Sequence, residues 1–115
     1  MNVNMIETDK GNVSYCKLSD KEINTTSDFL DVLLSCDSQI VAIDKASLAD
    51  KFFDLKSGLA GDFLQKVSNY RKKLIVIGDF TNSESNSLES FIYESNRGGR
   101  VLFVANIESG VDLLY

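Results

Sequence analysis

The residues best suited to binding chemistry lie in one stretch, residues 52–63 (FFDLKSGLAGDF), between two apolar runs. The pattern predicts that Asp54 or Ser57 caps the start of a helix. The candidate anion-binding residues at this start are Asp54, Lys56, Ser57 and Gly58. Backbone N–H groups at a helix start favour an anion, and a glycine lets it approach closely. Ordinary capping would use the same residues, and the glycine spacing fits neither a P-loop nor a dinucleotide-binding fingerprint.

A second set of candidate residues follows the apolar runs that we expect to be strands. It comprises Asp44, Lys45, Gly78, Asp79 and Phe80, with Ala105 and Asn106 after the last run. In a parallel sheet such strand ends share one edge, where ligands usually bind. Asp44 and Asp79 together could hold Mg²⁺ or share a proton there, or simply make turns and caps. The last strand is followed by no lysine, which disfavours a phospho-receiver domain.

A third set of candidate residues lies near the end of a predicted helix. Glu94 and Asn96, beside Arg97, could face a partner or ligand, or could form an ordinary polar helix end. The chain has no histidine, so it cannot build a Ser–His–Asp or Cys–His site alone. A pair of Ser57 with Lys45 or Lys56 has no supporting spacing. We therefore expect no catalytic residues, no cofactor and no bound metal.

Composition narrows the class of protein. The chain has 115 residues, of which 43% are hydrophobic and 25% charged, as in one ordinary globular domain spanning residues 1–115. The net charge is −5 and the one basic run, residues 71–73, lies at a predicted helix end, which disfavours nucleic-acid and membrane partners. Cys16 and Cys36 are expected to be reduced, buried fillers. No signal peptide or membrane-spanning run is present, so we expect a cytoplasmic protein.

The order of predicted elements indicates an α/β fold. Residues 2–7 and 13–18 alternate around a turn at residues 9–12 and predict a β-hairpin. Three apolar runs predict buried strands at residues 39–43, 74–77 and 101–105. Helical patterns fall between and after these runs, giving the order β-β-α-β-α-β-α-β-α. Such an order predicts three parallel strands joined by helices, and a mixed sheet once the hairpin is added.

Side-chain spacing predicts which residues of the helices face inward. The first helix shows Phe29, Leu30, Leu33 and Leu34 at helical spacing, after N-capping hydroxyls at residues 25–27. The second shows a stripe from Leu55 to Tyr70. The connector before it is expected to form one helical turn at residues 47–50, and Asn86 with Glu89 is expected to form a capping box for the third helix. The last helix is predicted at residues 108–114, with Val111 and Leu114 inward.

Three blocks, FFDLKSGLAGDFLQK, NYRKKLIVIGDF and FIYESNRG, resemble the bacterial family known as domain of unknown function 4180 over nearly the whole chain. That resemblance implies no established activity. A looser resemblance, to STAS domains such as anti-sigma factor antagonists, implies a STAS-like mixed sheet. Those domains carry a D-S-S-G-L-like segment, and Ser57-Gly58-Leu59 is similar to its end.

In anti-sigma factor antagonists a partner kinase phosphorylates the first serine of that segment. The matching position here is Lys56, and the preceding aspartate is replaced by Leu55. The phosphorylation switch therefore does not transfer directly, and Ser57, one residue later, is the phosphorylation candidate.

We therefore expect a non-catalytic, STAS-like regulatory or protein-interaction module in the cytoplasm, with a protein partner and possibly a homodimeric state. It would use the surface around residues 52–61. One alternative is a domain that binds a small molecule, nucleotide or anion at the second set of candidate residues, where the strands end. The other is a small enzyme that uses an Asp or Lys side chain as its acid–base catalyst.

Overall fold

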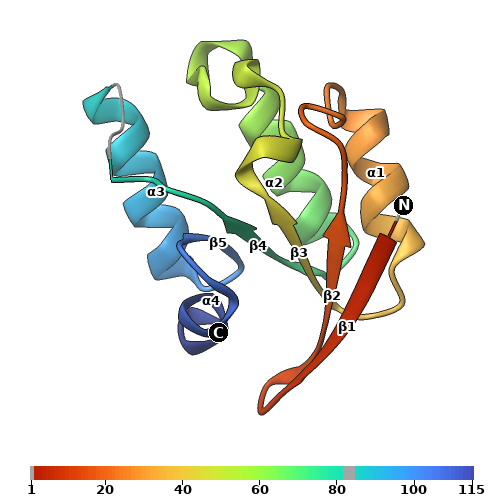
Figure 1. The fold of residues 1–115 in the computed structure, drawn as a ribbon. Helices are drawn as coiled ribbons and strands as arrows, with labels where there is room; N and C mark the ends of the chain where they lie inside the picture. The colour runs from red at the N-terminus through yellow and green to blue at the C-terminus, as the bar shows by residue number, and fades with distance from the viewer. Residues whose placement is uncertain (1, 82–84) are drawn as a thin grey trace.

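The structure is a computed structural model that describes residues 2–81 and 85–115 (Figure 1). The strands are β1 (Asn2–Thr8), β2 (Gly11–Lys17), β3 (Ile40–Asp44), β4 (Lys73–Ile77) and β5 (Val101–Val104). The α-helices are α1 (Thr26–Ser35), α2 (Leu59–Asn69), α3 (Asn86–Gly98) and α4 (Ile107–Leu113). Three short 3-10 turns, η1 (Lys45–Ser47), η2 (Asp50–Phe53) and η3 (Leu55–Ser57), lie between β3 and α2. The predicted order of strands and helices is confirmed.

The five strands form one mixed sheet in the order β1-β2-β3-β4-β5. β1 pairs with β2 in antiparallel register from Asn2 opposite Lys17 to Thr8 opposite Gly11, so the predicted hairpin is confirmed. The pairs β2–β3, β3–β4 and β4–β5 are all parallel. The parallel strands therefore end at one edge of the sheet, as the apolar runs predicted.

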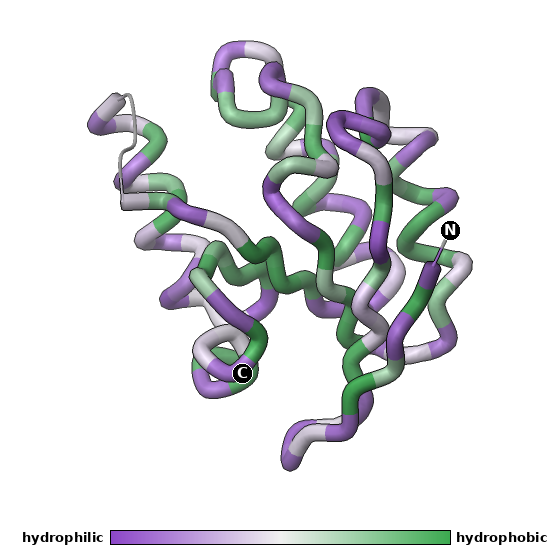
Figure 2. Tube along the Cα trace, viewed as in Figure 1, coloured by the Kyte–Doolittle hydropathy of each residue, from purple (hydrophilic) through white to green (hydrophobic). Residues whose placement is uncertain are grey.

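Helices cover the two faces of the sheet unequally. α1, α2 and α3 lie on one face and α4 lies on the other (Figure 1). Alternate residues of each central strand point to opposite faces, so Leu74 and Val76 join the core under α1–α3, whereas Ile75 joins the core under α4. Figure 2 accordingly shows the central strands as mostly hydrophobic. Both faces are buried there, which explains the continuous apolar runs.

Aromatic rings fill the larger core under α1–α3, and a lysine links the hairpin to α4 on the other face of the sheet. Phe29 of α1 stacks on Phe63 of α2 with ring centroids 4.3 Å apart, and Phe52 lies against Phe63 at 5.2 Å. On the opposite face Lys10, at the hairpin turn, donates from Nζ to the carbonyl oxygen of Val111 at 2.6 Å. This bond ties the hairpin to the carboxyl-terminal end of α4, where a cation also complements the helix dipole. None of the described helices is long and apolar enough to cross a membrane.

Two helices differ from their predicted inward faces. Thr25 caps α1 in a capping box with Asp28, in line with the predicted capping hydroxyls. Leu34, however, is 51% exposed and Val32 is buried in its place. At about 100° per residue, Val32 and Leu33 lie within about 60° of the buried Phe29 around the helix, whereas Leu34 lies about 140° away from it. Tyr70 is 48% exposed because it is the C-cap of α2, beyond the last helical turn.

The helix starts also differ from prediction. α2 begins at Leu59 with Gly58 as its N-cap, at φ +77°, so neither Asp54 nor Ser57 is the N-cap of the α-helix. Asp54 instead caps η3. The expected turn at residues 47–50 is replaced by η1 and η2, which flank an extended segment around Leu48. α3 is capped by Ser85, whose extended backbone aims its side chain at the N–H of Leu88, so the capping box of Asn86 and Glu89 was wrong.

Candidate functional site

A groove of about 820 Å³ opens at the edge where the parallel strands end; we call it the strand-end groove. It lies between the η2–η3 segment and the start of α3. Its lining residues are Lys45, Asp50, Phe53, Asp54, Leu55, Lys56, Phe80, Ser85, Ser87, Leu88 and Ile92. The groove thus joins Asp54 and Lys56 of the first predicted set with Lys45 and Phe80 of the second. The sequence placed these sets at separate sites.

Lys45 follows β3 directly, and its ammonium group lies among aromatic rings. Its Nζ is 5.0 Å from the ring centroid of Phe80 and 5.5 Å from that of Phe53, and it donates a hydrogen bond to the carbonyl oxygen of Asp79 at 2.8 Å. A cation over ring faces is attracted by their negative quadrupole. Lys45 is therefore held in place at the groove.

Gly78 makes this position of Lys45 possible. A Cβ atom built on Gly78 would lie 2.6 Å from Cβ and 3.0 Å from Cδ of Lys45. Gly78 continues the sheet by donating its N–H to the carbonyl oxygen of Val104 at 2.9 Å, so the backbone cannot easily retreat. The predicted binding residue Gly78 thus acts by leaving space for the stem of Lys45.

Asp79 is engaged in a turn. Its Oδ1 accepts hydrogen bonds from Oγ1 of Thr81 at 2.6 Å and from the N–H of Thr81 at 2.9 Å. These bonds hold the pKa of the Asp79 carboxyl below its usual value, and the bond from the Thr81 hydroxyl has the largest effect. The carboxylate therefore stays ionised and stabilises the turn by accepting the two hydrogen bonds from Thr81.

Asp44 lies with β2 residues on the α4 side of the sheet. The hydroxyl of Tyr15 donates to Oδ1 of Asp44, and Lys17 lies 3.7 Å from Oδ2 of Asp44 and donates to the Tyr15 hydroxyl at 3.0 Å. Burial has the largest effect on the pKa of Tyr15 and raises it above its ordinary value, and the hydrogen bond to Asp44 raises it further. Asp44 and Asp79 thus have different partners. Within residues 2–81 and 85–115, no three His, Cys, Asp or Glu side chains gather as a metal site.

The predicted anion-binding residues within residues 52–63 form hydrogen bonds with nearby backbone groups. Oδ1 of Asp54 accepts from the N–H of Lys56 at 3.2 Å. The exposed Ser57 hydroxyl donates to the carbonyl oxygen of Lys51 at 2.7 Å and accepts from the N–H of Leu59 at 3.2 Å. Ser57 and the adjacent Gly58 are outside the groove lining, so the first predicted set is divided between the groove and the start of α2.

The third predicted set lies apart from the groove. Asn96 brackets the backbone of Phe103 in the edge strand β5: its Oδ1 accepts from the N–H at 2.8 Å and its Nδ2 donates to the carbonyl oxygen at 3.2 Å. Ser95 donates to the carbonyl oxygen of Val101 at 2.6 Å. Glu94 is exposed and forms an ion pair with Arg97 at 3.7 Å. Asn96 therefore satisfies a strand edge that would otherwise be open.

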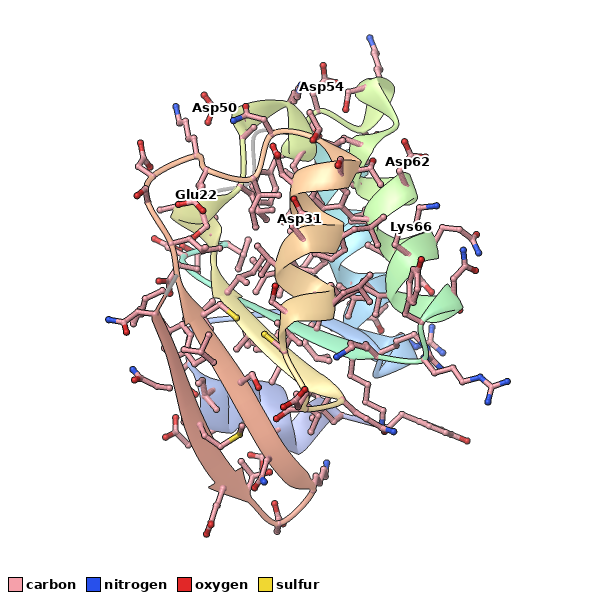
Figure 3. The ribbon with its side chains drawn as sticks, turned by 90° about the vertical axis from the view of Figure 1, so that its right-hand side faces the viewer. Glu22, Asp31, Asp50, Asp54, Asp62 and Lys66 are labelled. Atoms are coloured by element: carbon pink, nitrogen blue, oxygen red, sulfur yellow. The ribbon has the colours of Figure 1, made fainter. Side chains whose placement is uncertain are left out.

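Charge is balanced at the groove although the molecule is acidic. The groove lining contains Lys45 and Lys56 together with Asp50 and Asp54. Figure 3 shows Asp50 and Asp54 at the end of the molecule where α1 and α2 begin, with Asp31 and Asp62 further along those helices. The excess negative charge thus includes side chains outside the groove, and the groove itself has no strong preference for one sign of charge.

The sequence predicted only one apolar wall of the groove. Phe53 and Leu55 lie in the expected interaction surface around residues 52–61, but Leu88 and Ile92 on the other side were not among the candidate residues; all four side chains are half-buried. Two signals pointed to them: an aromatic pair directly before the candidate helix start, and apolar residues spaced by four at the start of α3. Both segments approach the strand ends, where Phe80 completes the wall.

Comparison with protein-family models shows a match to a family described as Domain of unknown function (DUF4180), over residues 8–114. The match includes every element from β2 to α4 and all residues of the strand-end groove. Comparisons with curated proteins and with solved structures found no match.

Proposed function

This chain belongs to the family described as domain of unknown function (DUF4180), and we propose that it is a non-catalytic module that binds a segment of a partner protein in the strand-end groove. The observation that carries the proposal is the convergence of half-buried apolar side chains on one open groove. They come from three segments of the chain, namely Phe53 and Leu55, Phe80, and Leu88 and Ile92.

The composition of the groove supports a protein segment as the occupant. Protein interfaces are built around aromatic and aliphatic cores with a polar rim and few charges at the centre. Here the apolar walls are accompanied by Lys45, Lys56, Asp50 and Asp54, whose charges cancel. An occupant with apolar side chains on one face and both signs of charge at its margins would match this pattern.

The polar side chains near the groove support a role without catalysis. A catalytic acid, base or nucleophile must reach the reacting group of the substrate. Asp79 is bonded to Thr81, and Asp54 and Ser57 are bonded to nearby backbone groups. Each of these candidates already performs a structural task.

We include in the proposal a STAS-like regulatory role in the cytoplasm, with Ser57 as the phosphorylation site. The Ser57 side chain is exposed, and its oxygen accepts from the N–H of Leu59 at the start of α2. Negative charge is favoured at the start of a helix, so a phosphate there would be stabilised by α2. It would also end the donation from Ser57 to Lys51, next to the groove wall.

The proposal is tested by site-specific photo-crosslinking in cells. A photoreactive residue at Leu88, in the groove, should give an adduct with one partner protein, and the same residue at Tyr93 should not. Tyr93 is a matched control because it is 63% exposed on the same helix but outside the groove. Leu88→Glu should abolish co-purification of that partner, and Tyr93→Glu should preserve it. Identical adducts from both positions, or none from position 88, would refute the proposal.

Binding of a small anion or nucleotide is the second candidate function. Its support is the groove volume of about 820 Å³, within the usual range for small-molecule sites, and the ammonium of Lys45 at the sheet edge. A ligand at about 100 times its Kd would raise the free energy of unfolding by about 2.7 kcal/mol in a thermal-shift screen. Such a shift that is lost in Lys45→Gln but kept in Leu88→Glu would favour this second function.

A further inference from the structure

Two cysteines meet in the core between β2 and the end of α1. Cys16 lies in β2 and Cys36 is the C-cap of α1, and their Sγ atoms are 3.2 Å apart. Both thiols are free, and the residues are 0% and 5% exposed respectively. The contact joins a strand to the helix packed upon it, so it depends on the tertiary fold.

The geometry around the two thiols suits bond formation. A disulfide has a sulfur–sulfur distance of about 2.05 Å, so the two Sγ atoms need to approach by about 1.2 Å. Cys36 follows the last helical residue in an extended conformation, with φ −102° and ψ 127°. In the reduced form the thiol of Cys36 also donates to the carbonyl oxygen of Val32 at 3.4 Å.

A half-buried cation lies beside the pair. Nζ of Lys72 donates to the carbonyl oxygen of Cys36 and, at 2.9 Å, to that of Ser38. Burial raises the pKa of the Cys16 thiol to about 12, and the nearby charge of Lys72 acts in the opposite direction. Since the thiolate is the reactive form, Cys16 reacts slowly while it is buried. Cys36 is 5% exposed as a residue, against 0% for Cys16, so we expect its thiol to react first.

We propose that Cys16 and Cys36 form a reversible intramolecular disulfide by exchange with a small-molecule disulfide. The Cys36 thiolate attacks one sulfur of the reagent, forming a mixed disulfide and releasing one small thiolate. Cys16, after losing its proton, attacks the Sγ of Cys36, which forms the protein disulfide and releases the second small thiolate. The protein loses two electrons and two protons, and the reagent is reduced to two small thiols.

The new bond would tie β2 to the end of α1 and enclose the whole of that helix in a loop from residue 16 to residue 36. Closing a loop of this length restricts the unfolded chain. We expect the oxidised protein to unfold at a temperature about 10 °C higher than the reduced protein.

The experiment uses the full chain with oxidised glutathione in two arms. In one arm the folded protein is incubated until thiol labelling becomes constant. In the other arm it is unfolded in urea and refolded with the same reagent, so that burial of the thiols no longer keeps the reagent away from them. The intact protein should lose the mass of two hydrogen atoms, resist alkylation after denaturation and yield one peptide linking Cys16 to Cys36. Dithiothreitol should reverse all three changes.

Cys16→Ala and Cys36→Ala serve as controls. Cys16→Ala should carry one glutathione adduct at Cys36, Cys36→Ala should keep a free Cys16 thiol in the folded arm, and neither should show a rise in unfolding temperature. If a variant fails to fold, the refolding arm of the unmodified chain still decides the question. The proposal is overturned if both arms leave two alkylatable thiols, if both cysteines keep separate glutathione adducts, or if the cross-links join two chains.

Discussion

Gly78→Ala should destabilise the protein by bringing a methyl group into contact with Lys45. The added Cβ would lie 2.6 Å from Cβ of Lys45, which is closer than non-bonded carbon atoms approach in proteins. Because Cβ is the root of the lysine side chain, rotation of that side chain cannot relieve the contact. The backbone at either Gly78 or Lys45 has to move.

The size of the effect follows from this geometry. Inserting a methyl group where the backbone has to shift costs about 2 kcal/mol. A shift of Lys45 would also weaken its contacts with the rings of Phe53 and Phe80, each worth roughly 0.5–1 kcal/mol at such sites. We therefore expect the free energy of unfolding to fall by about 2–3 kcal/mol, with the unfolding temperature falling by about 10 °C.

Urea unfolding followed by circular dichroism measures this change, and Gly61→Ala provides the control. A Cβ at Gly61 meets nothing within 4 Å, and Gly61 lies within α2. The same substitution there should raise stability by roughly 0.5–1 kcal/mol, because alanine favours the helix. Opposite signs for the two substitutions would locate the effect of Gly78→Ala in the contact with Lys45.

A double-mutant cycle identifies the atom responsible. Lys45→Gly removes the Cβ that Gly78→Ala would strike, whereas Lys45→Ala retains it. Combined with Gly78→Ala, the glycine variant should restore about 2 kcal/mol and the alanine variant should restore little. If Gly78→Ala costs less than about 0.5 kcal/mol, or if both lysine variants rescue it equally, the reasoning is refuted.

Three further predictions concern other parts of the fold. Asn96→Ala removes both hydrogen bonds to the backbone of β5 and should lower the free energy of unfolding in urea by about 2 kcal/mol. Gly110→Ala would place a Cβ 2.7 Å from Cγ2 of the buried Ile75, should cost about 2 kcal/mol in the same assay, and should be partly rescued by Ile75→Leu, which removes that atom. A hydrogen bond from the N–H of Asn24 holds the pKa of the Asp28 carboxyl below its usual value, so its contribution to stability is complete only well above that usual value and is lost as the pH falls through the lowered pKa; Asp28→Asn should therefore reduce the loss of stability on acidification below about pH 5.

Each of these predictions has a contrary outcome. Unchanged stability of Asn96→Ala would mean that water satisfies the edge of β5 equally well. A neutral Gly110→Ala variant would mean that α4 is free to move away from the sheet. An unchanged acid profile for Asp28→Asn would show that other carboxylates determine the acid response.

The sheet was predictable because its central strands are buried on both sides. The runs at residues 40–43, 74–77 and 101–104 contain no polar side chain, and each lies in a strand with one face under α1–α3 and the other under α4 or the hairpin. Their alternation with helical patterns was enough to predict parallel pairing. Single-residue details were less predictable, since Val32 and not Leu34 faces the core, and the positive φ of Gly58 delays the start of α2.

The groove could be predicted only in part. Lys45 and Phe80 were found because strand ends share an edge in any parallel sheet. Their approach to Leu88 depends on how far α3 lies from the η2–η3 segment, which local patterns do not specify. The role of Asn96 was also hidden, because its two bonds to β5 follow from that strand's position at the sheet edge. A polar residue at a helix end looks the same in sequence whether it faces solvent or a strand.

The strand order of the sheet has a consequence for how the chain folds. Each strand pairs with the strand that precedes it in the sequence, so each parallel pairing closes one crossover that contains a helix, and no pairing skips a strand. The entropy cost of closing a loop rises only slowly with its length, so this sheet is suited to growth from one strand to the next. The bond from Lys10 to Val111 is the exception, because it joins the hairpin to α4 across most of the chain. That bond therefore carries a larger loop-closure cost than any single pairing of neighbouring strands.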